Sequence, residues 1–334
     1  MGRYTHPALA EREEIMLTRH EGRSQADIAR ATGRDRPAIS REMRRKSFRV
    51  GAGRCYRAST AQRSHEARRL SCVRPRILDD AGLAGLAGRL VVRERWSPEQ
   101  IAGRIGVERP DLSVSVSTIY RAVNDGRLDP PELEHTKRGI RARLRHRGKR
   151  RHRRGGPEER RGRIPGARPI SERPAKVELR ARLGDWEGDT VVGRGSGACL
   201  VTLVDRMSGL LVGGRAATHT KRYIADVETA ALAGRPESRT VTLDRSKEFA
   251  DFARVEEATG AVFCFALPHH PRRRGTNENT NGLVREYFPK GTDFGAAGDE
   301  RVREVYDAIN RRPRKRHGFR TPYEVHHSQT LHLP

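Results

Sequence analysis

Five carboxylates in the second half of the chain have the types and spacing that metal-assisted phosphate chemistry requires. The stretch GDWEGD carries Asp185, Glu187 and Asp189 at every second position, so their side chains share one face if the stretch is extended. Asp244 ends the apolar segment TVTL, and Glu278 lies in the polar stretch TNENTNG. Because open α/β sheets place their sites at the carboxyl ends of strands, we expect some of these acids to converge.

Carboxylates from two strands and a helix start suit a hard divalent cation. Mg²⁺ and Mn²⁺ prefer such oxygens together with substrate phosphates, and the sequence has no His or Cys cluster to select a softer metal. Two such ions about 4 Å apart activate a water or a 3′-hydroxyl for in-line phosphodiester displacement. Spacing alone does not choose among Asp185, Glu187 and Asp189.

Basic and amide side chains surround the last acid. Arg285 lies seven residues after Glu278, on the same face of a predicted helix, and Lys290 follows. We expect both cations to contact nucleic-acid phosphates. Asn277 and Asn281 are expected to bond phosphates or to orient Glu278, with helix capping an equal alternative.

The bulk composition indicates a polyanionic partner. The 334 residues carry a formal net charge of +26, with only 35% hydrophobic and 5% aromatic residues. Arg and Lys displace condensed counterions from nucleic acid, so we expect DNA to be bound. The four cysteines are far apart and no long apolar run occurs, which predicts a cytoplasmic, nucleoid-associated protein that neither crosses a membrane nor forms disulfides.

Residues 24–46 have the pattern of a helix-turn-helix. Ser24 is a predicted N-cap and Gly33 a predicted turn, and the second helix is rich in Arg. An ordinary helical hairpin is the alternative. The residues expected to contact DNA are Arg36, Ser40, Arg41, Arg44 and Arg45.

Residues 96–126 repeat this pattern with less charge. The segment SPEQ predicts a capping box that begins at Ser97, and Gly106 is the predicted end of that helix. In the helix that follows, Thr118 and Arg121 are expected to face DNA.

A basic segment and an α/β region complete the chain. Residues 137–163 contain 14 Lys or Arg among 27 residues and almost no apolar side chain, which predicts an extended arm along DNA phosphates or a plain linker. The predicted parts are 1–70 (helix-turn-helix), 71–136 (second helix-turn-helix region), 137–179 (basic linker or arm) and 180–334 (catalytic domain).

The segments DTVVG, ACLVTLVDR, GLLVGGRAA, RTVTLD and AVFCFAL are predicted strands. Helices are expected near 219–234, 247–259 and 277–288. The first three strands have short connections, so we expect an antiparallel meander, followed by alternating helices and strands of an α/β domain.

Several segments resemble the bacterial insertion-sequence-thirty family of transposases. These are ISERP (170–174), GDWEGDTVVG (184–193) and RGTNENTNGLVREYFPKGTDF (274–294). WSPEQIAGRI and RPRKRHGFRTPYEV (312–325) are similar to further parts of that family. The resemblance covers nearly the whole chain, and the 33 residues between Asp244 and Glu278 make it specific.

The resemblance implies an RNase H-like, retroviral-integrase-type catalytic core preceded by all-α helix-turn-helix modules. It implies a triad of Asp189, Asp244 and Glu278 that holds two Mg²⁺ or Mn²⁺ ions. The implied activity is binding of terminal inverted repeats, metal-dependent strand cleavage and strand transfer into target DNA by a homo-oligomer. On this view Asp185 and Glu187 are solvated or paired with nearby Arg.

Two alternatives remain open at this point: a decayed copy that only represses by binding DNA, and an RNase H-type nuclease without strand transfer. Departures from the family bear on the first. Ser246 stands where the family has Gly, and Arg272 and Arg273 replace an aromatic residue and Glu or Gln.

Overall fold

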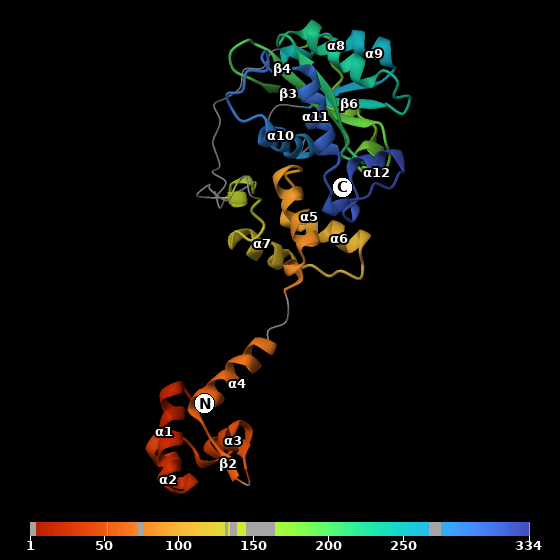
Figure 1. The fold of residues 1–334 in the computed structure, drawn as a ribbon. Coiled ribbons are helices and arrows are strands. Elements are labelled where there is room, and N and C mark those ends of the chain that lie inside the picture. The colour runs from red at the N-terminus through yellow and green to blue at the C-terminus, as the bar shows by residue number, and fades with distance from the viewer. Residues whose placement is uncertain are drawn as a thin grey trace. The chain divides into compact units, whose positions relative to one another are not determined.

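The computed structural model describes residues 5–51, 53–72, 76–130, 133, 139–144, 164–266 and 275–333. The chain forms two compact units, Met1–Asp79 and Asp80–Pro334 (Figure 1). Within the described ranges, no helix has the length and apolar character needed to cross a membrane.

The first unit is a small helical domain with a β-hairpin. Its elements are α1 (Leu9–His20), α2 (Gln25–Thr32), α3 (Arg36–Lys46), β1 (Phe48–Val50), β2 (Gly53–Cys55), α4 (Ala58–Ser71) and the 3-10 turn η1 (Ile77–Asp79). The Ser24 side chain caps α2, and Gly33 ends it at φ +64°, a left-handed conformation that glycine adopts without strain. Ile15, Ile28 and Ile39 are fully buried between the helices. The predicted pair of short helices with a glycine turn is confirmed.

The second unit begins with α5 (Ala81–Val92), α6 (Pro98–Glu108), α7 (Val116–Asn124) and the 3-10 turn η3 (Gly139–Arg143). The predicted capping box is confirmed, because Gln100 N donates to Ser97 Oγ at 3.2 Å and Ser97 N donates to Gln100 Oε1 at 2.8 Å. The predicted end at Gly106 is wrong. The helix continues to Glu108, since one glycine weakens a helix by only about 1 kcal/mol.

Part of the predicted basic arm packs against these helices. Ile140 is 0% exposed, and its turn η3 contacts α5 and α7. The backbone N–H of Ile140 also donates to Asp129 Oδ1 at 2.9 Å, so this part of the segment is packed rather than extended. Residues 145–163 lie outside the described residues.

A five-stranded sheet forms the centre of this unit. Its strands are β3 (Asp185–Val192), β4 (Cys199–Asp205), β5 (Leu211–Ala216), β6 (Thr240–Leu243) and β7 (Val262–Phe265), in the order β5-β4-β3-β6-β7. The pairs β5–β4 and β4–β3 are antiparallel, whereas β3–β6 and β6–β7 are parallel. The predicted meander followed by parallel strands is confirmed, and this is the RNase H-like arrangement.

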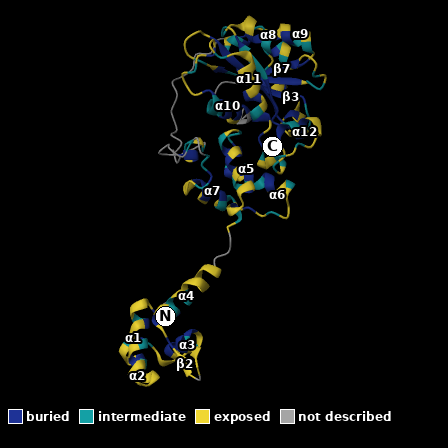
Figure 2. Cartoon of the chain, in the orientation of Figure 1, coloured by how far each residue is buried: buried dark blue, intermediate teal, exposed yellow. Residues whose placement is uncertain are grey.

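Helices cover both faces of the sheet (Figure 1). They are α8 (Lys221–Leu232), α9 (Phe252–Thr259), α10 (Gly275–Tyr287) and α11 (Asp299–Asn310), with the 3-10 turn η6 (Lys247–Phe249). Val201 belongs to the core cluster under α8 and α9, and its neighbour Leu200 to the cluster under α10 and α11. Every residue of β4 is accordingly buried, and Figure 2 shows buried stretches of the sheet in dark blue.

The segment that precedes β3 lies against the parallel side of the sheet. It contains the 3-10 turns η4 (Ile170–Glu172) and η5 (Ala175–Val177). Pro169 pairs with Phe265 in parallel, and Arg173 Nη1 donates to Thr242 Oγ1 at 2.9 Å. The segment ISERP, placed in the linker by the sequence, is thus part of the packing around the sheet.

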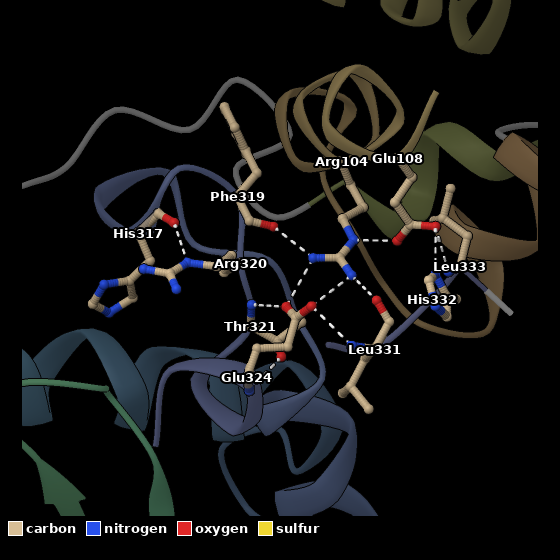
Figure 3. Close-up of polar contacts among 10 residues, drawn as sticks. All are labelled: Arg104, Glu108, His317, Phe319, Arg320, Thr321, Glu324, Leu331, His332 and Leu333. Carbon is tan, nitrogen blue, oxygen red and sulfur yellow. Dashed lines mark hydrogen bonds and ion pairs between the residues drawn. The ribbon is translucent and has the colours of Figure 1, made fainter. Parts of the chain in front are cut away.

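The chain ends with η8 (Lys315–His317) and α12 (Pro322–His327), and this C-terminal segment is bonded to α6. Arg104 is 2% exposed and donates to both carboxylate oxygens of Glu324 at 2.8 Å (Figure 3). It also donates to Glu108 at 2.5 Å and to the carbonyls of Phe319 and Leu331. One buried guanidinium therefore binds the second helical region to the end of the chain.

Candidate active site

Asp189 and Asp244 come from neighbouring parallel strands. Glu187 of β3 pairs with Thr242 of β6, so continuing this register by two residues sets Asp189 opposite Asp244. Asp244 follows the end of β6 and is 8% exposed. The predicted position of Asp244 at a strand end is confirmed.

Glu278 lies in the first turn of α10, with its side chain exposed. This helix packs on β3 and β4. Asn281, on the same helix face one turn later, donates from Nδ2 to Asp189 Oδ2 at 2.9 Å. The structure thereby places the start of α10 next to the first aspartate.

The three acids do not form a closed group. Among the described residues, no three His, Cys, Asp or Glu side chains lie close enough together to hold one ion. The donor chemistry still fits Mg²⁺ or Mn²⁺, because carboxylates on adjacent strands, with Asp189 within β3 and Asp244 just after β6, leave coordination positions for water and phosphate. Asp189 and Asp244 would supply the sheet side of such a site, and Glu278 would be the acid supplied by the first turn of α10.

The other two acids of GDWEGD are paired inside the protein. Asp185 is 2% exposed and accepts hydrogen bonds from Arg182 at 2.7 and 3.0 Å and from Thr240 at 2.8 Å. Glu187 is 0% exposed and pairs with Arg206. The predicted pairing with arginine is confirmed, whereas the solvated alternative is wrong for both.

Two asparagines of α10 form hydrogen bonds within the protein. Asn277 is 1% exposed; its N–H donates to Glu187 Oε2 at 3.2 Å, and its Nδ2 donates to the Glu187 carbonyl at 3.3 Å. Asn277 therefore bonds Glu187 inside the protein, instead of making the phosphate contact that the sequence predicted. Asn281 is half-buried and donates to Asp189, whereas the alternative prediction was that it orients Glu278.

Thr202 of β4 is a site residue that the sequence analysis missed. It is 0% exposed, and its hydroxyl lies 3.1 Å from the Asp189 carbonyl, 3.2 Å from Asn281 Oδ1 and 3.4 Å from Asn277 Oδ1. One hydroxyl hydrogen can serve only one of these acceptors at a time. The available signal was that Thr202 is the single polar residue in the apolar run CLVTLV (199–204).

Cations flank this end of the sheet. Arg285 Nη2 donates to the Val192 carbonyl at 2.7 Å, and its Nη1 has no hydrogen-bond partner among the described residues. Burial lowers the pKa of Arg285, which nevertheless stays charged at neutral pH. Lys290 is exposed.

The loop after Asp244 accommodates its departure from the family pattern. Ser246 has φ −78° and donates from its backbone N to Asp244 Oδ1 at 3.1 Å. No left-handed conformation is needed there, so the missing glycine causes no strain. Arg272 and Arg273 lie outside the described residues.

The side chains predicted to read DNA lie on the helix surfaces. Arg36, Ser40, Arg41, Arg44 and Arg45 are all exposed on α3. On α7, Arg121 is exposed, whereas Thr118 is half-buried and its hydroxyl lies 2.8 Å from that of Ser115.

This chain is similar to known proteins over its first helices and over nearly its whole length. A family model described as a helix-turn-helix domain matches residues 3–46. The catalytic core domain of BIV integrase is a weak structural likeness, with a TM-score of 0.35 and 16% identity over 43% of this chain and 94% of that one.

Three full-length relatives carry the assignment. The transposase of IS1086 from Cupriavidus metallidurans is 36% identical over 94% of this chain and 92% of its own. The transposase of IS4351 from Bacteroides fragilis is 34% identical, with coverage of 90% and 89%. Transposase InsI of IS30A from Escherichia coli is 34% identical, with coverage of 96% and 83%. The chain therefore belongs to the insertion-sequence-thirty family of transposases.

Proposed function

We propose that this transposase is a DDE-type enzyme that binds the terminal inverted repeats of its element, cleaves a DNA strand at each end and transfers it to target DNA. The observation that carries the proposal is the parallel pairing of β3, which contains Asp189, with β6, which Asp244 follows, together with the hydrogen bond from Asn281 of α10 to Asp189. Membership of a family whose relatives are named transposases supports it.

Asp189, Asp244 and Glu278 would hold the metal. A bound pair of Mg²⁺ or Mn²⁺ ions supplies Lewis acidity that activates the attacking oxygen and stabilises the leaving oxygen. Glu278 is exposed at the start of α10, and it would complete the ligand set from that turn.

The reaction needs no covalent protein intermediate. A water oxygen bonds to phosphorus at the element end, the P–O3′ bond breaks and the 3′-oxygen takes a proton. The freed 3′-hydroxyl then attacks a target phosphorus and releases a target 3′-hydroxyl. Arg285 and Lys290 would bind phosphate oxygens of the reacting strands.

DNA recognition would use the basic face of α3. The exposed side chains of Arg36, Arg41 and Arg44 lie on the second helix of the helix-turn-helix, the helix that enters the major groove in this motif. Arg121 of α7 would contact phosphates. Because two element ends must be joined together, we expect a homo-oligomer on DNA.

A supercoiled plasmid that carries the matching element ends tests the proposal. With Mg²⁺ or Mn²⁺, the unmodified protein should nick the plasmid at those ends and give products joined to target DNA. The Asp244→Asn variant should bind the ends with unchanged affinity and leave them intact. The Asp251→Asn variant is a matched control, because Asp251 pairs with Lys221 at the surface.

One observation favours a second candidate, a repressor that only binds DNA: the three acids do not form one ion-holding group among the described residues. Equal binding by the unmodified protein and Asp244→Asn, with nicking by neither, would establish that reading. Nicking without joined products would instead indicate a nuclease.

A further inference from the structure

Glu187 occupies an unusual position for a carboxylate. It lies in β3 between β4 and β6, is 0% exposed, and is two residues before Asp189. A buried carboxylate is costly unless both of its oxygens are matched by donors. Here one oxygen accepts from Arg206, which is itself 2% exposed, and the other accepts from the backbone N–H of Asn277 at 3.2 Å.

The second of these donors belongs to the first turn of α10. Asn277 is the third residue of the helix Gly275–Tyr287, and N–H groups in this turn have no partner within the helix. Glu187 therefore caps α10 from the neighbouring strand. Its negative charge also lies at the positive end of the helix dipole. The next residue of the helix is Glu278.

A second hydrogen bond sets the register of α10 on β3. Glu187 is joined to Asn277, and Asp189 is joined to Asn281. Two residues of strand advance about 6.6 Å and four residues of helix about 6 Å, so both pairs are made when strand and helix run side by side. A helix slipped by one residue would break both pairs and rotate Glu278 by about 100°.

Arg206, the partner of Glu187, is itself held in place by further hydrogen bonds. It donates from Nε to the Val177 carbonyl at 3.2 Å and from Nη2 to Glu178 at 3.3 Å. These contacts fix the guanidinium, which in turn fixes the Glu187 carboxylate. The chain of contacts runs from the segment before β3, through Arg206 and Glu187, to the turn that carries Glu278.

We propose that Glu187 is a positioning residue: its buried carboxylate caps α10 and thereby sets where Glu278 stands relative to Asp189. This inference rests on the proposed function, in which Glu278 is a metal ligand. Glu187 itself is occupied by Arg206 and Asn277 and does not join the ligand set.

The isosteric variant Glu187→Gln tests the inference. Glutamine has one acceptor oxygen and one NH₂ donor group, so it cannot accept from both Arg206 and Asn277. We expect the oxygen to stay with the charged Arg206 and the contact with Asn277 to be lost. Asp185→Asn is the matched control, because Asp185 is on the same strand, equally buried, and bonded to Arg182 and Thr240.

The first measurement is amide hydrogen exchange of the full-length protein without DNA or metal. Glu187→Gln should exchange about tenfold faster in α10, the change expected for loss of one hydrogen bond to a charged group, while β4 and β6 stay protected. Asp185→Asn should leave α10 unchanged. Equal exchange of α10 in Glu187→Gln and unmodified protein would overturn the inference, as would a uniform increase across the sheet in both variants.

The second measurement is the Mn²⁺ concentration that gives half-maximal nicking. It should rise about tenfold in Glu187→Gln, in proportion to the same lost contact, and stay unchanged in Asp185→Asn. Nicking by Glu187→Gln with unchanged Mn²⁺ dependence would refute the positioning role and leave the proposed function intact. If α10 exchanges faster in Glu187→Gln but the unmodified protein never nicks DNA, the cap is retained and the proposed function is refuted.

Discussion

The buried pair Arg104–Glu324 gives the sharpest prediction about stability. Burial alone would raise the pKa of Glu324, but hydrogen bonds from Arg104 and from the backbone N–H groups of Thr321 and Leu331 outweigh it and lower that pKa to about 2. Relative to the ordinary value of 4.5, the shift corresponds to about 3 kcal/mol of stability at neutral pH. Breaking a buried pair by removing one partner costs about 3–5 kcal/mol, which agrees with the value obtained from the pKa of Glu324.

A double-mutant cycle measures this quantity. The proteins are Arg104→Met, Glu324→Gln and the double variant. We expect Arg104→Met to lose about 3 kcal/mol at pH 7, and the coupling energy between the two sites to be of similar size. Because the folded-state pKa of Glu324 is lowered, its contribution is complete above pH 4.5 and is lost as the pH falls through 2. The coupling energy should therefore decrease in acid.

The two tryptophans make the assay specific. Trp96 and Trp186 are the only tryptophans and both belong to the unit Asp80–Pro334, so fluorescence during urea unfolding reports that unit alone. The control cycle uses Arg301 and Glu304, an exposed pair at 2.9 Å, for which we expect at most about 0.5 kcal/mol. A coupling energy for Arg104 and Glu324 no larger than that of the control would refute the reasoning.

Two further predictions concern the same region. Gly103→Ala should lower the free energy of unfolding by about 1–3 kcal/mol, because a new Cβ would meet the Phe319 ring at 2.3 Å. Gly106→Ala on the same helix meets nothing within 4 Å and should raise the free energy of unfolding by about 0.5–1 kcal/mol. Equal urea midpoints for the two variants would contradict this prediction. Burial and the neighbouring Arg316 lower the pKa of His317 to about 4, so stability is complete above pH 6.5 and is lost as the pH falls toward 4. His317→Gln should therefore lose less stability than the unmodified protein between pH 7.5 and 5, and parallel losses in urea titrations would exclude a neutral, buried imidazole.

The secondary structure was largely predictable because local chemistry decides it. Ser24, Gly33 and Ser97 mark helix boundaries through capping and backbone conformation, and the apolar segments of β3 to β7 are strands as expected. The errors have local causes as well. Gly106 does not end its helix, and the buried Ile140 belongs to a segment whose composition predicted an extended arm.

The environment of the acids was less predictable, because it depends on contacts between distant residues. The sequence suggests that Glu187 pairs with an arginine, but nothing local identifies Arg206 as that partner or the backbone of Asn277 as the second donor. The same holds for Arg104 and Glu324, which lie 220 residues apart. Such pairs are set by how the elements pack together.

The central claim is that Asp189, Asp244 and Glu278 hold catalytic metal together. The most direct test is the anomalous scattering of Mn²⁺ in crystals of the Asp189→Asn variant and of the unmodified protein, each bound to an element end. We expect Mn²⁺ in the unmodified complex to be coordinated by all three carboxylates, with weaker or absent signal in the variant. Ions bound elsewhere, or bound at the two aspartates while Glu278 stays out of reach on α10, would contradict it.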